Sequence, residues 1–176
     1  MSLPLKVERA FARYLTSVAP FLIGKGGSYV LTDTGLRIKL TSGDQFDFPV
    51  LPGQSICEVS APAIVAACLS ATQDITSMYT LNHRCSVEVT LFFPADADPG
   101  GLGTPQELLD CFEFAAKGLV ENLYCDDLDT LLKQYEPDLT ILHCTGPRTQ
   151  RSGWIQEQRT RVFVVAFDVI ATPAVL

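Results

Sequence analysis

The fold is decided by AlaIleValAlaAlaCysLeu (63–69) and, after a polar segment, ArgCysSerValGluValThrLeuPhePhePro (84–94). The first run is apolar throughout, as in a strand that is buried on both faces. In the second, the odd-numbered residues are apolar and the even-numbered residues as far as Thr90 are polar. This alternation predicts a strand with one buried face and one face that meets water or a neighbouring subunit. We therefore expect two strands joined by a polar loop.

Three helices are expected around these strands. In residues 3–18, apolar side chains recur at three- and four-residue spacing, which is typical of an amphipathic helix, and Pro20 is expected to end it. Thr104-Pro105-Gln106-Glu107 combines a cap, a proline at the first helical position and a capping-box glutamate. It therefore predicts the start of a long helix, whose apolar stripe runs to Leu123. A shorter helix is expected at about 126–134.

The segment between the first helix and residue 63 is irregular. GlyLysGlyGlySer (24–28) lacks the spacing of a phosphate-binding loop and follows no apolar strand, so we interpret it as a connector. Residues 29–31 and 36–40 predict a small hairpin. The prolines between 43 and 62 leave room only for short strands, such as one at 55–59.

The chain ends in a long predicted hairpin. Residues 139–144 and 154–170 are expected to form its arms, and 146–153, with Gly, Pro and Ser, are interpreted as its turn region. The second arm ends in a run that is apolar on both faces, as in a central strand. The order of elements predicts a single α+β domain spanning residues 1–176. In it, a mainly antiparallel sheet with a C-terminal β-hairpin packs against the N-terminal helix and the long central helix.

Composition and charge argue against several classes of protein. With 47% hydrophobic and 19% charged residues, the chain has the balance of an ordinary globular protein. Its longest apolar runs are far shorter than the ~20 residues that span a bilayer, and its N-terminus does not have the pattern of a secretory signal. We therefore expect no membrane partner. The net charge of −7 argues against sequence-specific nucleic-acid binding, which requires a basic surface.

The charge is unevenly placed along the chain. Residues 96–138 carry eleven Asp and Glu residues against Lys117 and Lys133, whereas residues 148–161 carry four Arg residues against Glu157. An acidic and a basic segment on one chain attract each other between copies of that chain. Two solvated faces without a partner are the alternative interpretation.

The sequence contains no motif for catalysis, cofactor binding or metal binding. The six cysteines include no Cys-x-x-Cys pair, which argues against zinc and favours reduced thiols. His143 and Cys144 are neighbours in a predicted strand, where adjacent side chains point to opposite faces, so they do not form a catalytic pair with each other. His83 opens a strand and is expected to be exposed. Asp96 and Asp98 follow a strand and are interpreted as turn residues.

Several features together resemble the tail terminator and tail-completion proteins of long-tailed bacteriophages. They are the N-terminal helix, the strand 63–69, the polar segment that leads to residues 84–91 and the AlaAspAlaAsp exit (95–98). The long helix from Pro105, PheProValLeuPro (48–52) and the closing strand 153–169 resemble that family as well. The resemblance covers most of the chain, and it implies a structural subunit that is not an enzyme and needs no cofactor.

The resemblance also implies a ring, commonly of six subunits, that ends the growth of the tail tube and joins the tail to the head. The expected partners are further copies of the chain, the tail-tube protein and the head–tail connector protein. The ring would be part of the virion, made in the host cytoplasm, and DNA would pass through it.

A closed ring needs two different contact faces on each subunit. The candidate contact residues come from the basic segment, the acidic segment and the single tryptophan: Arg148, Arg151, Trp154, Arg159, Asp126, Asp127 and Asp129. Two other interpretations stay open, because the tryptophan also fits a core position and the three aspartates also fit the N-terminus of a helix, where the dipole favours acids.

Two alternative functions stay open. One is another virion joint, such as a head–tail adaptor or a tail-tube subunit, and polymer state separates them: a tube protein makes long stacks, whereas a terminator stops at one ring. The other is a small intracellular enzyme whose site is assembled from scattered residues, with His143, Cys144 and an acidic cluster as the candidates. A pocket that contains a histidine with a strongly perturbed pKa would favour the enzyme.

Overall fold

The computed structural model describes residues 2–23, 28–32, 35–39, 45–53, 63–77, 80–94, 106–155 and 160–173. Within these residues the helices are α1 (Leu3–Ile23), α2 (Gln106–Leu123) and α3 (Leu128–Tyr135). The strands are β1 (Ser28–Thr32), β2 (Gly35–Lys39), β3 (Gln45–Pro52), β4 (Ala63–Ser77), β5 (Thr80–Pro94), β6 (Leu139–Ile155) and β7 (Thr160–Pro173).

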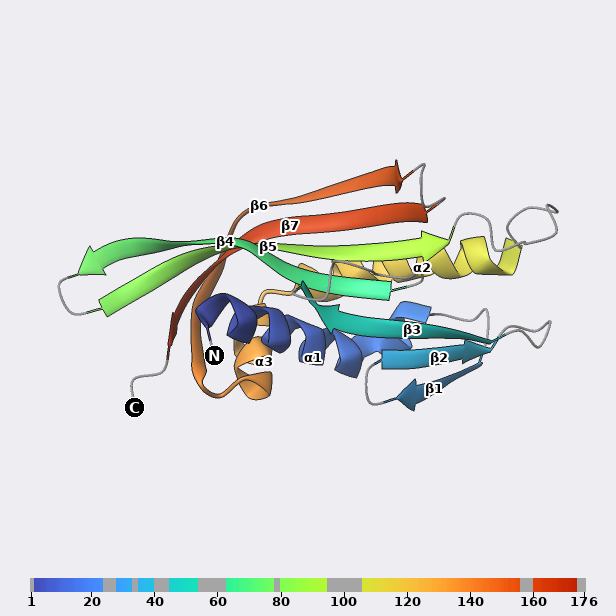
Figure 1. Cartoon of the computed structure of the whole chain (residues 1–176), viewed down its shortest axis with the longest axis horizontal. Helices are drawn as coiled ribbons and strands as arrows, with labels where there is room; N and C mark the ends of the chain where they lie inside the picture. The colour runs from blue at the N-terminus through green and yellow to red at the C-terminus, as the bar shows by residue number, and fades with distance from the viewer. Residues whose placement is uncertain are drawn as a thin grey trace.

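The strands form one mixed sheet in the order β1-β2-β3-β4-β5-β7-β6. Only the β3–β4 pair is parallel among the described strands, and every other neighbouring pair is antiparallel. The predicted α+β class is therefore confirmed, with a sheet that is mostly antiparallel. The last strand, β7, lies between β5 and β6 (Figure 1), which explains why its sequence is apolar on both faces.

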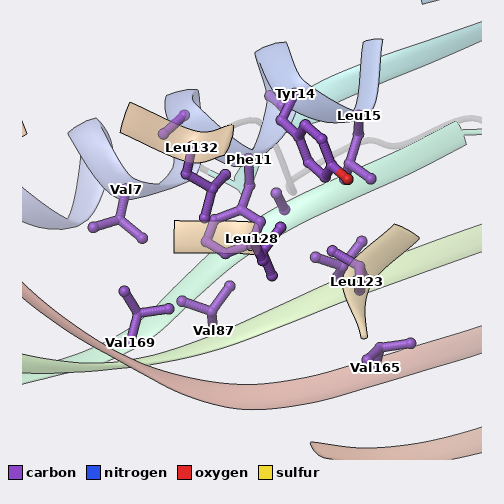
Figure 2. Close-up of a cluster of buried hydrophobic side chains, with 14 of the residues drawn as sticks. Val7, Phe11, Tyr14, Leu15, Val87, Leu123, Leu128, Leu132, Val165 and Val169 are labelled. Atoms are coloured by element: carbon purple, nitrogen blue, oxygen red, sulfur yellow. The ribbon is translucent and has the colours of Figure 1, made fainter. Parts of the chain in front are cut away.

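The helices cover one face of the central strands. In Figure 1, α1 and α2 lie below the right-hand parts of β5, β7 and β6, and α3 lies beside the lower ends of β6 and β7. Helix α1 packs against β3, β4 and α2, and α3 packs against α1 and β6. Figure 2 shows the side chains of α1 pointing toward Val87, Val165 and Val169, which rise from β5 and β7. The rings of Phe11 and Phe167 lie 5.2 Å apart between their centroids, at the middle of this core.

The alternation in residues 84–94 has the predicted effect. Cys85, Val87, Val89, Leu91 and Phe93 are each at most 1% exposed, and they belong to the core beneath the helices. The even-numbered residues point to the other side of the sheet, which we call the outer face. One strand thus separates the apolar core from a polar surface.

The predicted polar loop before residue 84 is wrong. Strand β4 continues to Ser77 and β5 begins at Thr80, so the polar segment forms the far half of a hairpin. An irregularity between Cys68 and Ser70 separates this half from the core half, and residues 71–73 are exposed. Polar side chains are tolerated there because pairing with β3 stops at Ala66, so this half of β4 is an edge of the sheet, and an exposed edge strand has no apolar periodicity.

The predicted turn at 146–153 is also wrong. These residues belong to β6, and the connection to β7 falls at residues 156–159, which lie outside the described part of the chain. Gly146 and Pro147 lie where the β6–β7 register shifts, between Thr145 and Thr149. A bulge in an edge strand accommodates a proline that would otherwise end the strand, so these residues bend β6 rather than reverse it.

Prolines are likewise less disruptive than expected in two other elements. Helix α1 passes Pro20 and continues to Ile23, so the backbone donor that this proline removes does not end the helix. Strand β3 contains Pro49, yet it spans eight residues. It pairs with β2 as far as Pro49 and with β4 from Val50 onward, so the proline lies where the strand changes partner.

The predicted hairpin at 29–40 is present as the antiparallel β1–β2 pair. The predicted strand at 55–59 and residues 24–27 of the predicted connector lie outside the described residues.

The core can be tested with a matched pair of leucines. Leu15, on the buried face of α1, is 0% exposed, whereas Leu69, at the irregularity in β4, is 61% exposed. We expect Leu15→Ala to lower the free energy of unfolding by about 2–5 kcal/mol, through lost burial and a residual cavity. Leu69→Ala makes the same chemical change and should stay within about 0.5 kcal/mol. Urea denaturation measures both, and equal losses would contradict this packing.

Candidate subunit-contact surfaces

The outer face of the sheet carries an ion pair that bridges three strands. Nη2 of Arg151 on β6 lies 3.2 Å from Oε1 of Glu88 on β5, with β7 between them. The strand register places Val164 of β7 beside Arg151 and Ala166 of β7 beside Glu88, so the ion pair runs diagonally across β7. The Arg151 side chain is 70% exposed, so the pair contributes little to stability and remains available to a partner.

A second polar contact lies on the same face. The hydroxyl of Ser86 donates to Oδ1 of Asp168, 3.0 Å away on the neighbouring strand. The outer face of β5 and β6 therefore carries charged and hydroxyl groups at these two places, whereas β7 between them contributes mostly apolar side chains such as Val164 and Ala166. A face of this mixed kind is suited to contact with another chain.

The other predicted residues of the basic segment are placed less fully. The backbones of Arg148 and Trp154 belong to β6, and the register puts Trp154 opposite Arg161 of β7. Their side chains, and the whole of Arg159, lie outside what the structure describes. Arg151 is thus the one predicted basic contact residue whose side chain has a defined position.

The predicted acidic residues meet at the corner between α2 and α3. Asp126 and Asp127 are exposed, and Asp129 is half-buried in the first turn of α3. Asp127 is the N-cap residue, but its side chain makes no capping hydrogen bond. Its charge still interacts favourably with the positive end of the helix dipole. We call these three residues the acidic corner. They share one region of the surface, as a contact role requires.

Helix α1 is fixed to this corner by a buried hydroxyl. The hydroxyl of Tyr14 donates to the carbonyl of Asn122, 2.9 Å away, and lies 3.8 Å from the Cys125 sulfur. The Cys125 thiol donates to the same carbonyl at 3.1 Å. Burial first, and then the neighbouring Cys125, raise the pKa of Tyr14 above its ordinary value. Burial also raises the pKa of the Cys125 thiol.

Arg13 ties the other side of α1 to the end of α3. Its Nη1 donates to the carbonyl of Tyr135 at 2.7 Å and to Oε2 of the buried Glu136 at 3.0 Å. The Tyr135 hydroxyl donates to Ser17 Oγ, 2.8 Å away. These contacts border a groove of about 520 Å³ between α1 and β3, with a mostly apolar lining. The lining residues are Arg9, Ala12, Arg13, Thr16, Ser17, Val50, Leu51, Pro52 and Tyr135, with no histidine or cysteine among them.

The residues considered for an enzyme are not brought together in the described part of the chain. His143 is exposed while Cys144 is buried, as alternation along a strand requires. Asp96 and Asp98 lie outside the described residues. Among the residues that are described, no group of three His, Cys, Asp or Glu side chains is placed to hold a metal ion.

A buried carboxylate on α1 has a role that the sequence patterns did not single out. Glu8 is 5% exposed, and its Oε1 accepts a hydrogen bond from the backbone N–H of Cys68 at 2.9 Å. Parallel pairing with β3 runs only as far as Ala66, so the carboxylate satisfies a donor just beyond the paired segment. The position of Glu8 in the sequence could have indicated this role. Glu8 precedes the buried Phe11 by three residues, so it lies next to the apolar stripe on the surface of the helix.

Comparisons with known proteins add no family. No protein-family model matches the chain, and a search of curated proteins finds no match. Within the described residues, no helix is both long enough and apolar enough to cross a membrane.

The Tyr14 contact predicts a dependence of stability on alkaline pH. Because the folded protein holds the Tyr14 proton more tightly than the unfolded chain does, this contribution is complete below about pH 10 and is lost as the pH rises above it. We expect the free energy of unfolding to fall more steeply above pH 10 in the wild type than in Tyr14→Phe, by up to about 1.4 kcal/mol per pH unit. Urea denaturation between pH 9 and 11 measures the two slopes. Identical slopes would contradict the assigned environment.

Proposed function

We propose that this chain is a structural subunit of a bacteriophage tail, which forms a closed ring that terminates the tail tube and joins the tail to the head. The observation that carries the proposal is the end of the β4–β5 hairpin, which extends past the helices in Figure 1. The end of the β6–β7 hairpin lies on the opposite side of the molecule, above α2. The order of elements that resembles the tail terminator proteins supports the same proposal.

The end of the β4–β5 hairpin and the edge of the sheet at β6 have little packing of their own. On β4, residues 70–73 are exposed, and the described part of the hairpin beyond His83 of β5 is no longer paired with β7. A two-stranded hairpin is at best marginally stable in water without further strands or a covering helix. On β6, the buried core residues Leu139, Ile141 and Cys144 all precede the register shift, whereas residues 150–153 beyond it are exposed on an edge strand. Contact with a neighbouring subunit would cover both places.

The charges supply two unlike faces. Arg151 lies on the outer face of the sheet, on its edge strand β6, and the acidic corner of Asp126, Asp127 and Asp129 lies at the junction of α2 and α3. Contact between two different surfaces of one chain is heterologous, and it produces a ring when the rotation closes. Opposite charges on those surfaces would fix the orientation of neighbouring subunits. We propose six subunits, with the tail-tube protein and the head–tail connector protein as further partners within the virion and DNA passing through the ring.

The proposal predicts a closed oligomer. The purified protein should form single rings of about six chains. When the ring closes, both contact faces of every subunit are occupied, so no further subunit can be added. Light scattering after size exclusion gives the mass, and negative-stain images show whether the rings stack. Long stacks would instead support a tail-tube subunit. A free monomer is compatible with assembly on the tube, so the decisive contrary result is a single copy on assembled tails.

A charge-exchange series tests the two faces. Arg151→Glu should weaken self-association by about tenfold, and more at low salt, where opposed charges are less screened. The Glu88→Arg/Arg151→Glu exchange restores the ion pair within the chain, so it should assemble as poorly as the single variant if Arg151 contacts a neighbour. Adding Asp126→Lys and Asp127→Lys to Arg151→Glu should restore assembly. If the exchange variant assembles normally, Arg151 serves only its own chain and this contact is wrong.

A further inference from the structure

Two cysteines lie together at the base of the β4–β5 arm. Cys68 of β4 is opposite Val87, and Cys85 of β5 is opposite Ala71, so the two cysteines are diagonal neighbours on adjacent strands. The register shift that follows Cys68 puts Cys68 and Ala71 on the same face. Cys85 belongs to the core, and Cys68 is packed against that core. Both cysteines are free thiols.

The two thiols influence each other. The neighbouring Cys85 raises the pKa of Cys68, with burial adding to the effect, and the neighbouring Cys68 lowers the pKa of Cys85 despite its burial. The Cys68 thiol also lies 3.4 Å from the carbonyl of Ser70, which it can donate to. Cys68 is half-buried, whereas Cys85 is fully buried. Small oxidants therefore reach this pair from the Cys68 side.

We propose that Cys68 and Cys85 are an oxidisable dithiol, which a small peroxide converts into a disulfide between β4 and β5. Hydrogen peroxide first oxidises one thiol to a sulfenic acid and releases one water. The second thiol then attacks the sulfenic sulfur and forms the S–S bond, and the displaced hydroxide leaves with the thiol proton as a second water. In sum, two thiols and one peroxide give one disulfide and two waters. This inference is independent of the proposed function.

The position of Cys68 and Cys85 in the β4–β5 hairpin means that a disulfide between them would affect the structure. The cysteines lie where the core half of the β4–β5 hairpin meets its extended half, next to the exposed Leu69. The Glu8 carboxylate holds the backbone of Cys68 at the same point. A disulfide here would join the two strands covalently at the junction and restrict the angle at which the arm leaves the body.

The sequence allows a sharp test on the full-length wild-type protein. Cleavage after Glu58 and Glu88 releases the peptide 59–88, in which Cys68 and Cys85 are the two cysteines present. After treatment with hydrogen peroxide and then with an alkylating agent, this peptide should be 2 Da lighter and carry no alkyl group. Subsequent cleavage at Arg84 should leave its two fragments joined until a reducing agent is added. Without peroxide, the same peptide should carry two alkyl groups.

A matched variant separates this pair from the other thiols. Cys125→Ser removes a thiol whose described contacts are with Tyr14 and Asn122, and it should leave formation of the linked peptide unchanged. Cys68→Ser should abolish it. The proposal is overturned if peroxide leaves both cysteines alkylatable, takes them to sulfinic acids without a cross-link, or joins Cys68 to a different cysteine.

Discussion

The rest of the structure depends on the burial of one face of α1 against the sheet. Phe11 and Leu15 are 0% exposed, and the Phe11 ring meets Phe167 of β7, the strand that separates β5 from β6. Helices α2 and α3 complete the same core through Leu119, Leu123, Leu128 and Leu132. The free energy gained by burying apolar side chains is proportional to the buried area and does not depend on direction. This core therefore holds the helices on the sheet but does not fix how α1 is rotated or shifted along it.

Polar contacts along the sides of α1 supply that direction. Glu8 accepts from the backbone of β4, Tyr14 donates to the end of α2, and Arg13 donates to the end of α3. Each contact joins α1 to a different element, so together they define its rotation and its position. The close approach of β3 depends on the same region: a Cβ at Gly53 would lie 2.6 Å from Ala67 and 3.0 Å from Glu8 Oε1. Glycine is therefore required where β3, β4 and α1 meet.

Regular periodicity in the sequence was enough to predict the elements that form the core. The alternation in 84–94 predicted β5 and its buried face, and the cap at 104–107 predicted the start of α2 closely. The prediction failed where strands carry no periodicity, as in the exposed half of β4, and where Gly146-Pro147 signals a turn although a bulge accommodates it. The Arg151–Glu88 ion pair could not have been predicted, because it joins residues 63 positions apart across an intervening strand. The contact roles of the predicted surface residues stay predictions.

The placement of β7 has a consequence for how the protein is made. Strand β7, which joins β6 to the rest of the sheet, is the last strand along the described chain, and Arg13 of α1 makes an ion pair with Glu136, 123 positions later. On the ribosome, at about 5–20 residues per second, the apolar face of α1 would wait roughly 8–30 s for Phe167 to be synthesised. The β4–β5 hairpin forms from local contacts, but β6 joins the rest of the sheet only after β7 has been synthesised. Premature termination would therefore yield a chain with an exposed core rather than a smaller folded protein.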